Sequence, residues 1–262
     1  MERLLEIMRR LRDPDHGCPW DRQQTYKTIL PYTLEEAYEV ADAIDREHYD
    51  DLKDELGDLL FQVVFYGQIA TEEGRFDFQD IVTAICDKLE RRHPHVFGDQ
   101  HIADAAAQTR AWEQHKKHER RQKSTDETYA SVLQDIPVNL PAITRAMKLH
   151  RRAAGVGFDW PDIHGVLEKL DEEVQELKHE IASNGSVERL QDEIGDLLFV
   201  ATILARHGGI DPESALRAAN SKFERRFRGV EQELSRQGRD IHQVSLQEMD
   251  AIWDRVKLEE HQ

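Results

Sequence analysis

The chain has 262 residues, of which 39% are hydrophobic and 33% charged, and its 52 acidic and 35 basic side chains give a formal net charge of −17. This length allows one large domain or two of ordinary size. The negative charge disfavours nucleic acid and anionic membranes as partners over most of the surface, so a polyanionic ligand would need a bound cation or a local basic cluster. Two cysteines without zinc spacing, and no apolar run of membrane-spanning length, lead us to expect a cytoplasmic protein.

The spacing of apolar residues predicts helices and no strands, hence an all-α fold. A first helix is expected over residues 2–12, followed by a turn that carries Trp20. A second is expected to begin at Thr33, with Glu36 completing a capping box, and to end near residue 46. A third is expected over residues 50–73, with a buried middle because its sequence from residue 59 is apolar almost all round.

Further helices are expected from Asp77 or Asp80 to the stop at Pro94, and as a charged segment around Trp112. Residues 123–141 are polar and contain two prolines, so we predict a linker there.

The second half of the chain repeats the first. The acidic motif EExxE and the motif ExxD occur as Glu35–Glu39 with Glu55–Asp58, and again as Glu172–Glu176 with Glu193–Asp196. Glu55 follows Glu39 by 16 positions, and Glu193 follows Glu176 by 17. A later basic motif, KLERRH, recurs as KFERRF, and Trp112 recurs as Trp253. We therefore predict a tandem duplication, with domains 1–122 and 142–262 joined by the linker 123–141.

Each half predicts one group of four carboxylates. Acids three residues apart share one helix face, and two antiparallel helices would bring two such pairs together. Oxygen ligands suit a hard divalent cation such as Mg²⁺, and carboxylates beside a buried helix need a cation or strong donors nearby. The candidate metal ligands are Glu173, Glu176, Glu193 and Asp196 in the second half, and Glu36, Glu39, Glu55 and Asp58 in the first.

Other residues are candidates for contact with a phosphate chain. Lys222, Arg225 and Arg226 form the local basic cluster that a polyanionic ligand requires, although helix salt bridges would explain them as well. Trp253 could stack on a base, against the commoner role of a packing tryptophan. Lys169 and Arg189 flank the acidic motifs and are weaker candidates.

One more acidic residue has a candidate role in the chemistry. Glu172 adjoins the carboxylates of the second half and could take a proton from an attacking water. A single Glu-x-x-Glu pair is common on solvated helix faces, and it is the matched repetition that favours a functional site.

Together, the paired EExxE…ExxD motifs, KFERRF, KLERRHPHVF and GCPWD resemble those of the MazG family over nearly the whole chain. The resemblance implies helical bundles that complete their sites by dimerisation, and Mg²⁺-dependent hydrolysis of canonical and aberrant nucleoside triphosphates to a monophosphate and pyrophosphate. Carried onto this chain, it implies the metal ligands Glu173, Glu176, Glu193 and Asp196, and the nucleotide contacts Lys169, Arg189, Asn220, Lys222, Arg225, Arg226 and Trp253.

The two copies differ in ways that favour the second as the main catalyst. Alignment of the basic motifs puts Asn220 opposite Cys86, and an amide can read a base or a phosphate where a thiol largely cannot. The first copy also breaks after its basic motif at His93-Pro94-His95, where the second continues as a helix.

Three other functions compete with this one. A di-iron bundle needs Glu-x-x-His on two helices of the bundle; Glu176–His179 supplies one, but the equivalent stretch from Glu39 ends in Asp42. An HD phosphohydrolase is excluded because none of the 13 histidines precedes an aspartate. A helical dimerisation module without activity remains open, as do the base and sugar preference and the choice among damaged nucleotides, dUTP-like species and an alarmone as substrate.

Overall fold

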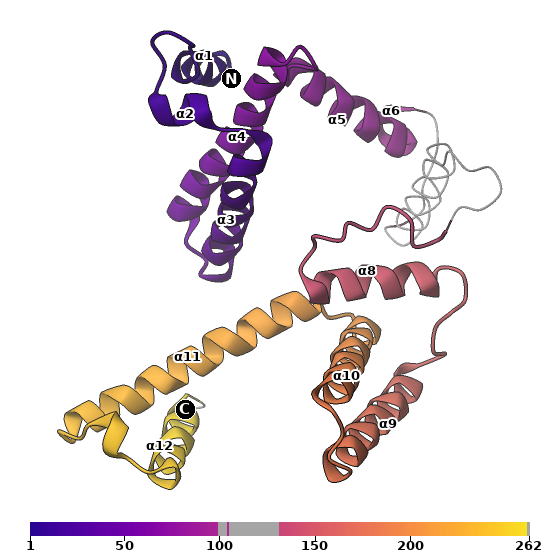
Figure 1. Cartoon of the computed structure of the whole chain (residues 1–262), viewed down its shortest axis with the longest axis vertical. Helices are drawn as coiled ribbons and strands as arrows, with labels where there is room; N and C mark the ends of the chain where they lie inside the picture. Colours follow the sequence, from indigo (N-terminus) through magenta and orange to yellow (C-terminus); the bar gives the residue numbers. More distant parts are fainter. Residues whose placement is uncertain (99–103, 105–130, 261–262) are drawn as a thin grey trace. The chain divides into compact units, whose positions relative to one another are not determined.

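A computed structural model describes residues 1–98, 104 and 131–260 of the chain (Figure 1). The regular secondary structure of these residues is helical, which confirms the predicted all-α fold. The chain divides into two compact units, unit 1 (Met1–His118) and unit 2 (Glu119–Gln262). The predicted helix around Trp112 lies outside the described residues, as does the predicted linker up to residue 130; residues 131–141 contain turns and no helix.

Unit 1 is built on a long helical hairpin that α1 and α5 flank. Its described helices are α1 (Glu2–Leu11), α2 (Pro19–Gln23), α3 (Tyr26–Asp45), α4 (Tyr49–Glu72), α5 (Phe78–Arg92) and α6 (Pro94–Phe97). Helices α3 and α4 pack closely, and the turn between them contains Glu47 in a left-handed conformation with φ of 56°. This short connection makes the two helices antiparallel, as the sequence predicted.

The core of unit 1 lies where α1 and the start of α3 meet the apolar half of α4. Met8 and Phe65 are fully buried there, and Ile29, Val64 and Ile69 complete the cluster. Removing a side chain such as Phe65 from water contributes roughly 1.5–3 kcal/mol. The predicted burial of the middle of the third helix is therefore confirmed, and this core holds α3 against α4 in unit 1.

The predicted start of α3 is wrong. The helix begins at Tyr26, eight residues before Leu34, and its capping box is formed by Thr25 and Thr28. Thr33 lies inside the helix, where its hydroxyl is 2.8 Å from the hydroxyl of Tyr66. Pro31 is tolerated in the second turn of the helix, so it does not force a boundary before Thr33.

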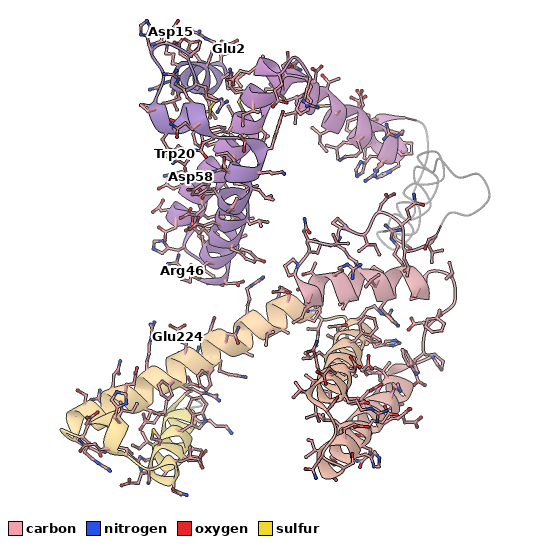
Figure 2. All side chains as sticks on the ribbon, viewed as in Figure 1. Glu2, Asp15, Trp20, Arg46, Asp58 and Glu224 are labelled. Atoms are coloured by element: carbon pink, nitrogen blue, oxygen red, sulfur yellow. The ribbon has the colours of Figure 1, made fainter. Side chains whose placement is uncertain are left out.

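Other predicted boundaries are confirmed. The first and third predicted helices correspond to α1 and α4, and Asp77 caps α5 in a reciprocal box with Asp80. The expected turn at Trp20 is instead the short helix α2, which starts at Pro19 and leaves Trp20 about half exposed, at 48% (Figure 2).

Unit 2 repeats the hairpin and adds a longer C-terminal pair. Its described helices are α8 (Ala142–Ala154), α9 (Ile163–Ala182), α10 (Val187–His207), α11 (Pro212–Arg236), the 3₁₀ turn η1 (Ile241–Gln243) and α12 (Leu246–Glu259). Helices α9 and α10 form the hairpin that matches α3 and α4, and its turn contains Asn184 with φ of 51°. The matched left-handed residues in both turns show that the duplication extends to the backbone.

Two apolar clusters stabilise unit 2. Val166, Val200 and Ile203 form the cluster between α9 and α10. A second cluster, around Val230 and Ile252, joins α11 to α12. Helix α11 is continuous where the corresponding part of unit 1 breaks between α5 and α6 at Pro94, as predicted. No helix among the described residues is both long enough and apolar enough to cross a membrane.

Candidate active site

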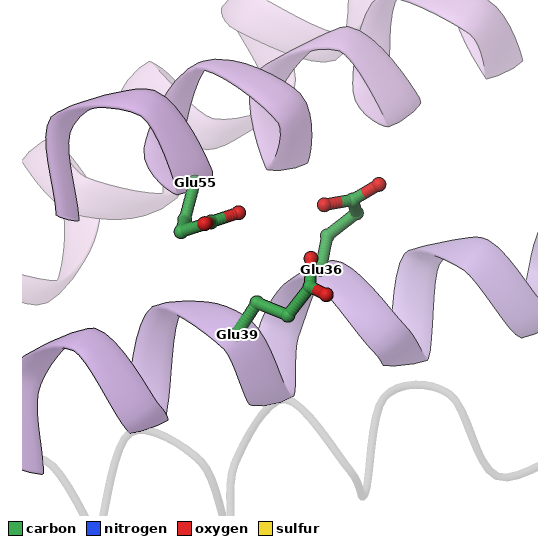
Figure 3. Close-up of side chains that lie close together, drawn as sticks. All are labelled: Glu36, Glu39 and Glu55. Atoms are coloured by element: carbon green, nitrogen blue, oxygen red, sulfur yellow. The ribbon is translucent and has the colours of Figure 1, made fainter. Parts of the chain in front are cut away.

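The hairpin of unit 1 brings three glutamates from two helices together. Glu36 and Glu39 project from α3 towards Glu55 on α4, and one carboxylate oxygen of each lies within 4.8 Å of the others (Figure 3). The first two are three residues apart, so they share one face of α3, and the antiparallel hairpin places Glu55 opposite that face.

The hairpin of unit 2 produces the same group. Glu173 and Glu176 of α9 and Glu193 of α10 also offer oxygens within 4.8 Å of one another. The side chain of Glu173 is only 5% exposed, whereas Glu176 lies on the surface. The structure thus brings together three of the four carboxylates predicted in each half.

The fourth predicted carboxylate of each half stands slightly apart. Asp58 and Asp196 are exposed and lie outside the three-glutamate groups, although their charges still act on them. Each is three residues beyond a group member on the same helix face, but an aspartate side chain is one methylene shorter than glutamate.

The electrostatics of both groups are those of crowded anions. Burial, followed by the charges of Asp58 and Glu39, raises the pKa of Glu36, and burial followed by Glu39 and Asp58 raises that of Glu55. In unit 2, burial and then the charges of Glu176 and Glu173 raise the pKa of Glu193. The carboxylates repel one another, and a bound cation would remove that repulsion.

One oxygen in each group is buried without a donor. Among the described residues, no hydrogen-bond partner reaches Oε2 of Glu36 in unit 1 or Oε2 of Glu173 in unit 2. A buried carboxylate oxygen without a partner is costly, so both positions fit an oxygen-binding cation.

The second carboxylate oxygen, Oε1, has a different partner in Glu36 of unit 1 and in Glu173 of unit 2. The Gln62 amide on α4 donates to Oε1 of Glu36 at 3.4 Å. In unit 2 the ammonium of Lys169 lies 2.9 Å from Oε1 of Glu173 and 3.0 Å from Oε1 of Glu172. The hydrogen bonds that the ammonium donates to Glu173 and Glu172 raise the pKa of Lys169, which therefore stays charged.

A cavity opens beside the carboxylates of unit 2. It has a volume of about 490 Å³ and is lined by Glu172, Gln175, Glu176, His179, Glu180, Arg189 and Glu193. Arg189 donates to the buried Glu180 across the cavity wall at 2.8 Å, which holds its guanidinium beside the group. Two predicted residues, Glu172 and Arg189, are therefore brought to the glutamates.

The residues predicted on α11 and α12 form a separate surface. Glu260 binds the guanidiniums of both Arg225 and Arg226 at 2.7 Å, and these hydrogen bonds lower the pKa of Glu260 to about 2. The Arg226 guanidinium also lies 5.9 Å from the centre of the Trp253 ring, which packs into the cluster between α11 and α12.

Asn220 and Lys222 are exposed on the same helix. Helix α11 packs chiefly on α12, and it meets α8 near its start, where Thr144 contacts Glu213 at 3.4 Å. The basic residues are therefore held by α12 rather than by the hairpin that carries the carboxylates.

Glu180 and Gln62 contribute to the sites and were not singled out in the sequence. Glu180 follows Glu173 and Glu176 along one face of α9, so helical periodicity would have found it. Gln62 is one polar residue in an apolar stretch, and only its buried position next to Glu36 reveals its role.

Comparison with known proteins agrees with this geometry. The domain described as "MazG nucleotide pyrophosphohydrolase domain" matches residues 24–97 and 162–230, which span both hairpins. A nucleoside triphosphate pyrophosphohydrolase of Escherichia coli K12 is 54% identical over 99% of this chain and 98% of its own length. A Thermotoga maritima protein named nucleoside triphosphate pyrophosphohydrolase/pyrophosphatase MazG is 41% identical over 98% of this chain and 95% of its own.

A solved structure was also matched. The crystal structure of a MazG-related protein from Thermotoga maritima is 29% identical, with a TM-score of 0.39, and the match covers 45% of this chain and 99% of that one.

Proposed function

The chain belongs to the MazG family, whose domain occurs in both of its halves, and from this premise we propose that it is a nucleoside triphosphate pyrophosphohydrolase. It would cleave the bond between the α and β phosphates with water, giving a nucleoside monophosphate and pyrophosphate. The observation that carries the proposal is the three-glutamate group on each helical hairpin, with its buried, unpartnered oxygen.

Mg²⁺ is the cofactor that this donor set fits. Glu173, Glu176 and Glu193 would hold the ion, with Asp196 beside them, because carboxylate oxygens are the ligands that Mg²⁺ prefers. When bound, the ion supplies neutralisation of phosphate charge and polarisation of the phosphorus that water attacks.

Side chains around the three glutamates of unit 2 would accept the proton and bind the nucleotide. Glu172 lines the cavity and is the proposed acceptor of the proton that the attacking water loses. Arg189, from the same cavity, and Lys169, which contacts Glu172 and Glu173, would contact phosphate oxygens as the pyrophosphate leaves. Asn220, Lys222, Arg225, Arg226 and Trp253 would bind the rest of the nucleotide, canonical or aberrant.

We also propose that a homodimer completes the site. The hairpin exposes large apolar side chains beside the carboxylates, among them Ile194 at 47% and Leu198 at 55%, and unit 1 exposes Leu56 and Leu60 at the matching positions. A second copy packed against these side chains would remove them from water. The same contact would bring Lys222, Arg225 and Arg226 of α11 near the carboxylates of a hairpin. Cytoplasmic action in control of the nucleotide pool would suit the two free cysteines.

A product assay tests the proposal directly. The chain is incubated with canonical and modified nucleoside triphosphates in Mg²⁺, and monophosphate, pyrophosphate and orthophosphate are each quantified. We expect monophosphate and pyrophosphate in equal amounts, and loss of both when the ion is chelated. Orthophosphate without pyrophosphate would refute the bond assignment, and no turnover of any triphosphate would favour a dimerisation module.

A further inference from the structure

The residue four positions before the buried glutamate differs between the two hairpins. In unit 2 it is Lys169, whose ammonium contacts both Glu173 and Glu172, and whose side chain is 29% exposed. The lysine therefore places one positive charge on an oxygen of the three-glutamate group while part of its side chain stays in solvent.

In unit 1 the corresponding residue is Tyr32. Helices α3 and α9 have the same length of 20 residues, so alignment of their first residues pairs Tyr32 with Lys169 and Glu36 with Glu173. The Tyr32 ring packs edge-on against Trp20, with 5.8 Å between ring centres. The contact that Glu36 receives comes from a neutral amide, so the described part of unit 1 has no tethered cation in this place.

An ammonium and a divalent cation compete for the same carboxylate. Lys169 neutralises part of the charge that would otherwise attract the ion, and its contact with Glu173 must break or lengthen when an ion takes that oxygen. Lysine is a compact charge on a flexible stem, so it can move without unfolding the helix. The ammonium that is released stays beside the group, where a phosphate oxygen is the next available anion.

We propose that Lys169 is a tethered counter-ion that holds Glu173 and Glu172 until a divalent cation binds, and then transfers to a phosphate of the nucleotide. The transfer also frees Glu172 to accept a proton. By linkage, the cation and the nucleotide then strengthen each other's binding in unit 2, whereas unit 1 takes its cation without this coupling. The nucleotide half of this inference rests on the proposed function, and the cation half does not.

Binding of Mn²⁺ without nucleotide tests the cation half. Free Mn²⁺ is measured by electron paramagnetic resonance during titration of the full chain carrying Glu55→Gln, which weakens the group of unit 1. Adding Lys169→Met should tighten Mn²⁺ binding about five- to tenfold, which is up to one decade in dissociation constant. Lys169→Arg, which keeps the charge, should leave the affinity low.

Two further variants control for position. Lys178→Met removes the same charge from an exposed place on α9 and should change the affinity less than about twofold. Tyr32→Lys, in a chain carrying Glu193→Gln, should weaken Mn²⁺ binding to the group of unit 1. Unchanged or weaker Mn²⁺ binding in Lys169→Met would overturn the proposal that Lys169 acts as a counter-ion.

An α,β-methylene triphosphate tests the transfer. This analogue should tighten Mn²⁺ binding to unit 2 by a larger factor in the parent chain than in Lys169→Met, because only the parent has an ammonium to transfer. Equal factors would overturn the transfer. Absence of pyrophosphate release, with the Mn²⁺ effect of Lys169→Met intact, would refute the proposed function and support the counter-ion.

Discussion

In unit 1 the partly buried Glu36 receives a neutral amide from Gln62, whereas its counterpart Glu173 in unit 2 is paired with the ammonium of Lys169. A second difference lies at the far end of the hairpin. Glu180 and Arg189 form an ion pair in unit 2, and the corresponding residues of unit 1 are Ala43 and Asp51. Asp51 faces Arg46 and His48 of its own turn instead.

The two units share the framework of the carboxylate group and differ in the side chains around it. The three glutamates, the antiparallel hairpin and the left-handed turn residue occur in both units. The side chains around the carboxylates have diverged, and those of unit 2 include the cations Lys169 and Arg189. Because a triphosphate carries several negative charges, these two cations lead us to expect that unit 2 is the better triphosphate site.

The largest expected effect is on the rate of pyrophosphate release, which should depend on the glutamates of unit 2 and little on those of unit 1. Glu193→Gln removes one carboxylate ligand from unit 2, and we expect pyrophosphate release to fall by at least about 1000-fold, because each 1.4 kcal/mol of lost transition-state stabilisation costs a factor of ten. Glu55→Gln makes the same change in unit 1 and should alter the rate less than about threefold. The measurement is the initial rate at saturating triphosphate and Mg²⁺.

One pattern of rates would contradict the assignment of unit 2 as the main catalyst. If Glu55→Gln abolishes turnover and Glu193→Gln does not, unit 1 is the catalyst and the cationic surroundings of unit 2 serve another purpose. Equal losses would mean that the two groups act together.

The carboxylate groups were predictable because their determinants are local. Glutamates three residues apart must share a helix face, and the short turns after residues 45 and 182 bring a second helix against it. Spacing also groups Asp58 and Asp196 with the glutamates, and it does not show that the three glutamates of each half lie closest together.

The remaining differences depend on contacts that the spacing does not encode. The motif Thr33-x-x-Glu36 matches a capping box, but the helix extends back to Thr25, and Thr33 meets Tyr66 of the next helix. The basic motif of α11 was interpreted as a phosphate cluster, and the structure adds its partner Glu260, which lies 34 residues beyond Arg226. Only packing of α12 on α11 brings these charges together.

A middle-sized effect concerns the Glu180–Arg189 pair. Arg189→Met leaves Glu180 buried without its donor, and we expect the free energy of unfolding of unit 2 to fall by about 1–3 kcal/mol. The double variant Glu180→Ala/Arg189→Met should recover most of this loss, since Ala43 occupies the matching position of unit 1. Urea titration of the full chain, with hydrogen exchange to assign the loss to α9 and α10, measures both variants. A double variant no more stable than Arg189→Met would show that the ion pair is not what the helix end requires.

The smallest expected effect is a difference in acid sensitivity. In unit 2, His150 is buried against the Trp160 ring and accepts a hydrogen bond from Arg206 at 3.1 Å. Burial, and then the charge of Arg206, lower the pKa of His150 below the value of about 6.5 that an unfolded histidine has. Protonation therefore favours the unfolded chain, so this contribution to stability is complete above about pH 6.5 and declines as the pH falls below it.

Unit 1 places Arg12 and Glu72 between α1 and α4, with 2.6 Å between the charged groups. Burial opposes the charge of Glu72, but hydrogen bonds from Arg12 and Gln68 lower its pKa, so this pair contributes until the pH falls below about 4.3, the value of an unfolded glutamate. Between pH 7.5 and 5.5 we therefore expect amides of α8 and α10 to lose hydrogen-exchange protection while those of α1 and α4 keep it. His150→Asn, which retains an acceptor for Arg206 but does not titrate, should abolish the difference. Equal losses in both units would place the acid sensitivity elsewhere than in His150.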